Sequence, residues 1–329
     1  MIMKKLLLLL LLFFAGCASG QPVQPELTQS QDAAQQITAS PKELNVKPVV
    51  PQLSSQAPDY VNRVQYLGKD SVIGMVRQYT VKENDSLIEI ARRFDLGYNE
   101  ITDANPGIDP FVPDSNISVL IPTEWILPDV RLHEGIILNI SEMRLYFFPD
   151  KHSRFTYTFP IGIGDDGKET PVGNFKIINK TAQPYWIVPK SIRKENPKLP
   201  KVVPPGPDNP LGSHALRLSI PSILIHGTNK PWGIGRKVSH GCIHLYPEDI
   251  SWLFNHVKKG MRVTIIKQPV KIGVRANRVY LEVHPDGKIN YLRQAIILLS
   301  RKNLLNRINS AKLNRAIKEK RGIPVIISN

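Results

Sequence analysis

The stretch Ile223-Leu-Ile-His226-Gly-Thr-Asn229 is followed, after a glycine-rich connector, by Ser239-His-Gly-Cys242-Ile-His-Leu245. Three apolar residues that end at His226 predict a buried strand that delivers this imidazole at its end. Gly241 lets the backbone turn tightly just before Cys242. A catalytic thiol needs a base, a group that orients the base, and N–H donors aimed at the oxyanion. The stretch offers a candidate for each role and therefore predicts a cysteine nucleophile site.

The chain holds two cysteines, Cys17 and Cys242, whose surroundings differ completely, so a structural disulfide is not expected. A lone cysteine without other signals is more often inert packing, since free Cys is among the most buried residue types. Here His226 precedes Cys242, and His240 and His244 flank it. This histidine-rich setting favours a catalytic nucleophile.

A zinc site is the alternative interpretation of the same residues. His240, Cys242 and His244 alternate, and His226 and His214 are available as further ligands. No paired ligand spacing and no supporting carboxylate accompany them. We therefore predict neither a metal nor a cofactor, and metal analysis of the purified protein tests the alternative.

The motifs around His226 and Cys242 together resemble the L,D-transpeptidase family, whose catalytic domain is often called YkuD. Two further stretches agree: Pro160-Ile-Gly-Ile-Gly164 with Thr170-Pro-Val-Gly-Asn-Phe175, and Pro205-Gly-Pro-Asp-Asn-Pro-Leu-Gly212. The resemblance covers residues 131–268. It implies a mainly β or α+β catalytic domain, β-sandwich-like with few short helices, and an enzyme that cross-links or trims peptidoglycan stem peptides.

The resemblance also implies a role for each residue of the motif. Cys242 would be the nucleophile, His226 its general base, and the backbone carbonyl of Gly227 the group that orients the base. The amides of His240, Gly241 and Cys242 would form the oxyanion hole, which Ser239 and the His240 ring would support. The implied substrate contacts are His244, Thr228, Asn229 and Trp232.

In the implied reaction, the thiolate attacks the carbonyl of the diaminopimelate residue of a tetrapeptide stem, and D-Ala leaves. An amine then resolves the acyl-enzyme. An acceptor stem gives a 3-3 cross-link, a lysine of an envelope lipoprotein gives a protein anchor, and water makes the enzyme a carboxypeptidase. The reverse reaction at the same thiol would release lipoprotein from peptidoglycan. The resemblance also implies that carbapenems acylate Cys242.

His244 departs from the family pattern. Many members carry Arg two residues after the cysteine, where a guanidinium is able to hold a substrate carboxylate bidentately. The imidazole of His244 is smaller, often neutral near pH 7, and does not form that fork. We therefore expect the donor or acceptor preference to differ from that of members with Arg.

The N-terminus carries an export signal. Lys4 and Lys5 precede an apolar run over residues 6–14, which is too short to span a bilayer. Phe14-Ala-Gly-Cys17 resembles a lipobox, which makes residues 1–17 a lipoprotein signal and Cys17 the acylated residue; an ordinary signal peptide is the alternative. Ala18 in place of aspartate favours the outer membrane, facing the periplasm. Residues 18–75, rich in Gln, Pro, Ser and Ala, predict a flexible tether.

Residues 76–123 predict a small β-α-α-β unit. Ser86 and Glu89 have capping-box spacing, and apolar residues follow at helical intervals up to Phe94. A second short helix is expected over residues 98–104 and a closing strand over 118–121. The order resembles a LysM module, which binds glycans that contain N-acetylglucosamine, although that family usually has Gly where Asn84 stands.

Residues 122–128 predict a short linker, and the catalytic region then shows strand patterns with one clear helix over residues 247–257. Residues 180–212 lack such a pattern, which indicates a lid or binding loop beside the substrate groove. The expected strands cover residues 135–140, 144–148, 155–159, 173–178, 215–218, 223–225, 262–266 and 280–283.

Lys and Arg total 43 against 28 Asp and Glu, a net charge of +15, which raises the question of an anionic partner. The chain has no zinc-finger spacing and no RNA-binding aromatic signature, and its export signal makes an anionic envelope the expected neighbour instead of nucleic acid. Residues 269–329 form a basic extension. Leu304, Ile308 and Ala311 would share one helical face there, packed on the domain or bound to a membrane or wall surface.

The combined prediction is a periplasmic L,D-transpeptidase that is lipid-anchored to the outer membrane and acts on peptidoglycan stems and glycan strands. A carboxypeptidase or a lipoprotein-cleaving enzyme would use the same thiol. An alternative of another class is a wall-binding LysM lipoprotein with an inactive catalytic fold, which replacement of Cys242 distinguishes from an enzyme.

Overall fold

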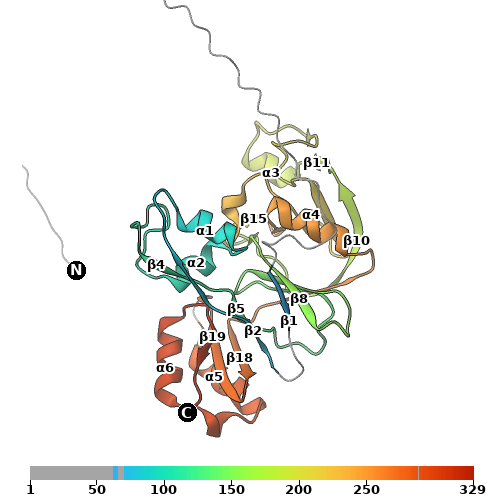
Figure 1. Ribbon diagram of the computed structural model, residues 1–329. Coiled ribbons are helices and arrows are strands. Elements are labelled where there is room, and N and C mark those ends of the chain that lie inside the picture. The colour runs from blue at the N-terminus through green and yellow to red at the C-terminus, as the bar shows by residue number, and fades with distance from the viewer. Residues whose placement is uncertain (1–61, 66–69, 288) are drawn as a thin grey trace, which may run out of the picture. The chain divides into compact units, whose positions relative to one another are not determined.

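The computed structural model of the 329-residue chain describes residues 62–65, 70–287 and 289–329 (Figure 1). The predicted signal peptide with Cys17, and the tether up to residue 61, lie outside the described residues. None of the helices in the described residues combines the length and the apolar character that crossing a bilayer would require.

A nine-stranded mixed sheet forms the centre of the region that the sequence predicts to be catalytic. Two of its pairings, β17 with β6 and β14 with β16, are parallel, and the others are antiparallel. The seven strands predicted between residues 135 and 266 all belong to this sheet and are confirmed. In sheet order the strands are β1 (Asn62–Gln65), β8 (Phe155–Pro160), β7 (Arg144–Phe148), β6 (Gly135–Asn139), β17 (Arg262–Ile266), β10 (Gly173–Ala182), β13 (His214–Leu218), β14 (Leu224–His226) and β16 (Ile243–His244).

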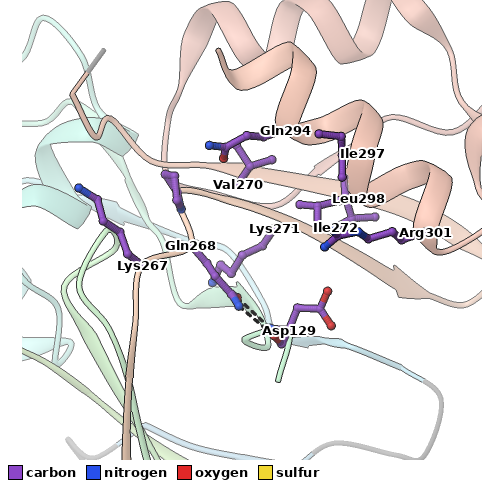
Figure 2. Close-up of a pocket in the computed structure, with 11 residues that line it drawn as sticks. Asp129, Lys267, Gln268, Val270, Lys271, Ile272, Gln294, Ile297, Leu298 and Arg301 are labelled. Carbon is purple, nitrogen blue, oxygen red and sulfur yellow. Dashed lines mark hydrogen bonds between the residues drawn. The ribbon is translucent and has the colours of Figure 1, made fainter. Parts of the chain in front are cut away.

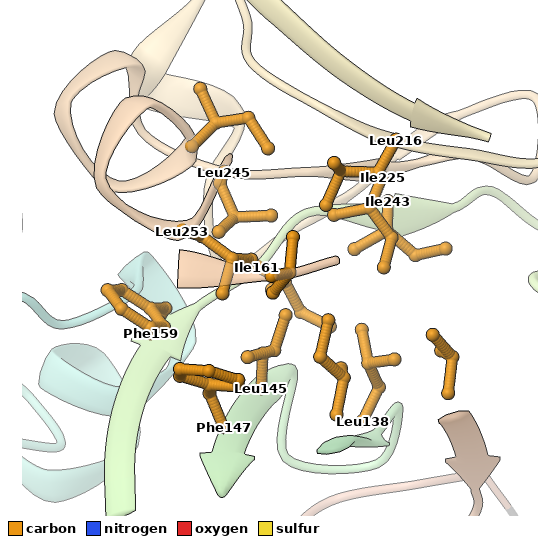
Figure 3. Packing of buried hydrophobic residues seen from close by; sticks show 14 of the residues in the cluster. Leu138, Leu145, Phe147, Phe159, Ile161, Leu216, Ile225, Ile243, Leu245 and Leu253 are labelled. Atoms are coloured by element: carbon orange, nitrogen blue, oxygen red, sulfur yellow. The ribbon is translucent and has the colours of Figure 1, made fainter. Parts of the chain in front are cut away.

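The main hydrophobic core lies between this sheet and helix α4. This helix covers Pro247–His256, close to the predicted range of residues 247–257. Ile250 and Leu253 of α4 belong to the same cluster as Ile225 and Ile243, and Figure 3 shows these layers in contact. Because side chains alternate along a strand, burial of Ile225 and Ile243 on this side directs their neighbours to the opposite face. The core therefore fixes the two strands that carry the predicted site.

A second core lies on the other face of strands β6 and β7. Ile136 and Leu138 join the main core. Ile137, Tyr146 and Phe148 instead pack with the N-terminal module, the β-α-α-β unit predicted at residues 76–123. Both faces of these two strands are therefore covered, which explains why every residue of β6 and β7 is buried.

The N-terminal module has the predicted order β3 (Arg77–Thr80), α1 (Leu87–Arg93), α2 (Tyr98–Ala104) and β4 (Ser118–Ile121). Ser86 caps α1: its Oγ accepts the N–H of Glu89 at 3.2 Å, and the Glu89 carboxylate accepts the N–H of Ser86 at 3.2 Å. Asn84 has a φ of 66°, a left-handed conformation that Gly adopts freely and Asn tolerates. The β-α-α-β prediction is confirmed.

The predicted linker at residues 122–128 is instead a buried strand, β5 (Glu124–Ile126), which pairs with β2 (Val72–Gly74). Trp125 is 1% exposed, and its indole N–H donates to Glu100 at 3.1 Å. The flanking prolines suggested a linker, but the apolar residues between them are covered by neighbouring elements. The predicted tether also ends earlier than residue 75. Strands β1 and β2 lie within its predicted range, and they pair with β8 and β5.

Arg144 joins the N-terminal module to the catalytic sheet. Its side chain is fully buried, and its guanidinium lies 2.7 and 2.8 Å from the two carboxylate oxygens of Glu100. It also donates to Thr158 Oγ1 at 2.6 Å and to the Asp95 carbonyl at 2.8 Å, and its guanidinium carbon lies 4.4 Å from the Trp125 ring. The buried charge is thus paired with one carboxylate, and each guanidinium nitrogen donates at least one hydrogen bond.

The C-terminal residues fold around a core of their own. They form β18 (Val270–Arg275), β19 (Arg278–Val283), α5 (Tyr291–Arg301), α6 (Ser310–Glu319) and β20 (Val325–Ile326). The predicted shared helical face is wrong, because Leu304 and Ile308 lie between the two helices and only Ala311 lies in α6. Asn303, with a φ of 56°, marks the break after α5.

A groove of about 290 Å³ lies beside α5 and the start of β18 (Figure 2). Apolar side chains of Ile272, Ile297 and Leu298 line the groove together with the charged side chain of Arg301. None of the predicted site residues lines this groove.

Residues 180–212 contain more regular structure than predicted. β11 (Trp186–Ile187) pairs with β12 (Val202–Val203), and helix α3 (Lys190–Glu195) lies between them in the chain. The two-residue strands are too short to show a period in the sequence.

Candidate active site

His226 and His244 lie side by side on the parallel strands β14 and β16, where they are partners in the register. Their ring centroids are 4.5 Å apart. The backbone of His244 also exchanges two hydrogen bonds of 2.9 Å with Gly162, which fixes the outer edge of β16. Both imidazoles therefore project from the sheet face opposite the main core.

The environment of His226 defines its tautomer. Its Nδ1 lies 2.6 Å from the carbonyl oxygen of Gly227, and a carbonyl only accepts, so Nδ1 carries the proton. Burial, together with the neighbouring His244 ring, lowers the pKa of His226 well below its ordinary value. Nε2 is then an unprotonated acceptor at neutral pH, as a general base requires.

Cys242 directly precedes β16 and is partly exposed. Its Sγ lies 3.5 Å from the carbonyl oxygen of Ser222, and within the described residues no hydrogen bond joins it to His226. Burial raises the pKa of the thiol, while the Leu224 N–H and the charge of Arg217 oppose that rise. The resting pair is therefore a neutral thiol and a neutral imidazole.

The turn before Cys242 is held by two hydroxyl groups. Ser239 Oγ donates to the Cys242 carbonyl at 2.6 Å and accepts the N–H of Gly241 at 3.1 Å. Thr170 Oγ1 donates to the Gly241 carbonyl at 3.0 Å. Gly241 has a φ of 102°, and a Cβ there would lie 3.1 Å from Ile223. Glycine is thus required at this position.

Of the three amides predicted for the oxyanion hole, that of Gly241 is occupied by Ser239. Within the described residues, the N–H groups of His240 and Cys242 have no hydrogen-bond acceptor. These two amides remain available for a developing oxyanion. Thr170, which supports the same turn, was not predicted as a site residue because its contact spans 71 residues.

The His240 ring points toward helix α3. Its Nε2 lies 3.0 Å from Glu195 and 2.7 Å from Lys168 Nζ, and Lys168 pairs with Glu195 at 2.8 Å. This ring therefore links the catalytic turn to the segment predicted as a lid. Glu195 and Lys168 carried no signal in the sequence, because the contact forms only in the fold.

The remaining predicted substrate contacts follow His226 along the chain. Thr228 is buried, and its hydroxyl accepts the N–H of Lys230 at 2.9 Å. Asn229 donates to the Asp208 carbonyl at 3.2 Å, which ties it to the proline-rich segment. Trp232 lies in the 3₁₀ turn η1 (Pro231–Gly233) and is 58% exposed.

The one group of potential metal ligands found among the described residues is Glu142, Glu282 and His284. All three are buried, but the ammonium of Lys271 lies 2.6 Å from Glu142 and 2.8 Å from Glu282. The carboxylates therefore already share a cation. The cluster joins the C-terminal strands to the catalytic sheet.

The neutral resting pair predicts the pH dependence of thiol alkylation. Since the pKa of Cys242 is raised, we expect its reaction with iodoacetamide to accelerate about tenfold per pH unit from pH 6 to 8, as the thiolate fraction grows. The measurement uses protein that begins at Ala18, in which Cys242 is the only thiol. A plateau between pH 5 and 7 would instead indicate a thiolate–imidazolium pair.

Comparison with known proteins identifies two domains. The L,D-transpeptidase catalytic domain family, YkuD, matches residues 133–265, and the LysM domain family matches residues 79–110. The chain is 42% identical to the probable L,D-transpeptidase YcfS of Escherichia coli, over 63% of this chain and 68% of that protein. It is 36% identical to the probable L,D-transpeptidase YbiS of the same species, over 77% and 88% of the two chains.

Proposed function

Because this chain belongs to the L,D-transpeptidase family, we propose that it transfers peptidoglycan stem peptides through an acyl-enzyme on Cys242. The observation that carries this proposal is the position of His226. Its Nδ1 proton is bound by Gly227, its Nε2 is unprotonated, and it lies on the strand beside the one that Cys242 precedes.

The first half of the reaction forms the acyl-enzyme. The thiol turns from the Ser222 carbonyl and gives its proton to His226 Nε2, and Sγ attacks the diaminopimelate carbonyl carbon. The oxyanion accepts hydrogen bonds from the N–H groups of His240 and Cys242. Collapse of this intermediate breaks the C–N bond, and His226 returns the proton to the nitrogen of the departing D-Ala.

The second half releases the product. An amine attacks the thioester carbonyl while His226 accepts a proton from its nitrogen. The second tetrahedral intermediate collapses with cleavage of the C–S bond, and Cys242 regains its proton. An acceptor stem yields a 3-3 cross-link, and the lysine of an envelope lipoprotein yields a protein anchor.

The location proposed for this activity is the periplasm, with the chain anchored to the outer membrane through acylated Cys17. The lipobox-like Phe14-Ala-Gly-Cys17 and the apolar run before it support this proposal. The LysM module would hold the enzyme on glycan strands. The hydrogen-bonded contacts of Arg144 would keep that module and the catalytic sheet together during binding.

The test is mass spectrometry of purified disaccharide-tetrapeptide incubated with protein that begins at Ala18. A dimer that lacks one D-Ala is expected and would identify a 3-3 transpeptidase. Tripeptide alone would indicate hydrolysis or a missing protein acceptor. The control is the same protein alkylated with iodoacetamide, which should form neither product.

If neither a product nor an acyl-enzyme forms, the transpeptidase proposal fails for this donor. Lipoprotein linked to muropeptide is then the substrate that tests the cleaving reaction. Binding to peptidoglycan without any thiol-dependent product would favour the non-catalytic alternative.

A further inference from the structure

His244 does not supply the positive charge that many family members place two residues after the nucleophile. Its ring lies against His226, and burial lowers its pKa to about 4, so it is neutral under ordinary conditions. A neutral imidazole in this position forms no ion pair with a substrate carboxylate. If the substrate carboxylate is held by a cation, another residue has to provide it.

The strand register places Arg217 on the same sheet face as the nucleophile. Arg217 of β13 is the partner of Leu224 in β14. One residue further along β14, Ile225 pairs with Ile243, so Leu224 lies beside Cys242. Because register partners project to the same face, Arg217, Leu224 and Cys242 form a row across three neighbouring strands.

The core confirms which face this row occupies. Leu216 and Leu218, the neighbours of Arg217 in β13, are buried in the main core, as are Ile225 and Ile243. Alternation then turns Arg217 to the opposite, solvent-accessible face, and Arg217 is exposed there. At a strand spacing of about 4.8 Å, two strands separate its Cα from that of Cys242 by roughly 10 Å. An extended arginine side chain covers much of this distance.

The guanidinium of Arg217 has no partner in the part of the chain that the structure describes. Among the described residues it has no hydrogen bond and no ion pair, whereas Arg92, Arg93, Arg144 and Arg275 all pair with carboxylates. The positive charge of Arg217 also acts to lower the pKa of the Cys242 thiol, against the larger effect of burial. An unpaired, bidentate donor beside a nucleophile is suited to an anionic part of the substrate.

We propose that Arg217 is a substrate-binding residue that holds a carboxylate of the donor stem peptide in a bidentate contact. This inference rests on the proposed transpeptidase function and assigns its donor specificity. The row from Arg217 to Cys242 would set the distance between the bound carboxylate and the attacked carbonyl. The guanidinium would thereby take the place of the cation that His244 lacks.

The test compares Arg217→Gln and Arg217→Lys with the unaltered protein, measured as acyl-enzyme formation against donor concentration. A charge-assisted bidentate bond contributes about 1.5–3 kcal/mol, so the apparent KM of Arg217→Gln should rise roughly 10- to 150-fold. The maximal rate should change little, because the contact exists before and during the attack. Arg217→Lys should recover part of the affinity.

Donor peptides with one carboxylate amidated at a time identify the group that is bound. The correct amidated donor should bind the unaltered protein as weakly as the intact donor binds Arg217→Gln, with no further loss in the variant. The matched control is Arg278→Gln, an exposed arginine at the start of β19. It should leave KM unchanged.

The outcomes separate this inference from the proposed function. If the unaltered protein forms no acyl-enzyme, the transpeptidase proposal fails first. If it does and Arg217→Gln keeps its KM, the carboxylate contact is wrong while the activity stands. Equal urea midpoints of variant and unaltered protein verify that the variant is folded, and a fall in maximal rate with constant KM would also overturn the inference.

Discussion

Replacing Cys242 with alanine is expected to abolish acyl-enzyme formation and to lower product formation by roughly 10⁴- to 10⁶-fold. No other side chain in the turn replaces the thiol. The hydroxyl of Ser239, the nearest candidate, donates to the Cys242 carbonyl and accepts the Gly241 N–H. Intact-mass measurement after incubation with tetrapeptide, and separately with a carbapenem, shows whether an adduct forms.

The control for this variant is its stability. The thiol of Cys242 donates one weak hydrogen bond and the residue is partly exposed, so the urea midpoint of Cys242→Ala should stay close to that of the unaltered protein. Thiol-dependent product that persists in the folded variant would contradict the assignment of Cys242 as nucleophile. Loss of both fold and activity would be resolved with Cys242→Ser, which keeps the size of the side chain.

Replacing Arg144 with alanine is expected to destabilise the protein by about 3–5 kcal/mol, because the charge of Glu100 would be left buried without its partner. The variant also loses the hydrogen bonds to Thr158 and to the Asp95 carbonyl. Urea unfolding at equilibrium measures the change, and an earlier separate transition of the LysM module is a further expected sign.

Arg92→Ala is the matched control, since Arg92 also joins the LysM module to the catalytic domain. Its pair with Glu248 has a length of 2.8 Å, but the side chains are 44% and 26% exposed. Solvent screening limits such a pair to about 1 kcal/mol or less. Equal destabilisation by the two variants would contradict the role given to burial. The double variant Arg144→Met with Glu100→Gln should recover part of the loss.

The sequence predicts most strands and helices correctly, because their apolar residues recur at the period of the element that they form. The LysM helices follow from the capping box at Ser86 and the spacing after it. The errors occur at strands whose burial is not indicated by an apolar period in the sequence. The strand around Trp125 is bounded by prolines, and β18 carries Lys271, which is 1% exposed yet paired with two carboxylates. A charged residue in a sequence gives no sign of such compensation.

The motif around Cys242 supplies its own residues for the site, but not those that reach it from elsewhere in the chain. Thr170, Glu195 and Arg217 lie 72, 47 and 25 positions before Cys242 in the sequence. Thr170 reaches the site through a hydrogen bond to the Gly241 carbonyl, Glu195 through its contact with His240, and Arg217 through strand pairing. Motif spacing does not encode these pairings, so a sequence predicts the nucleophile more readily than the residues around it.

Strand β1 has a mechanical consequence. Asn62, its first residue, pairs with Thr158 at the edge of the catalytic sheet, and its side-chain amide donates to the carbonyls of Phe94 and Asp95 at 3.0 and 3.2 Å. A pulling force that enters the chain ahead of Asn62 would therefore be divided between the sheet and the end of helix α1. An enzyme tethered by its N-terminus would transmit tension to both domains together, and neither would be drawn away from the other under load.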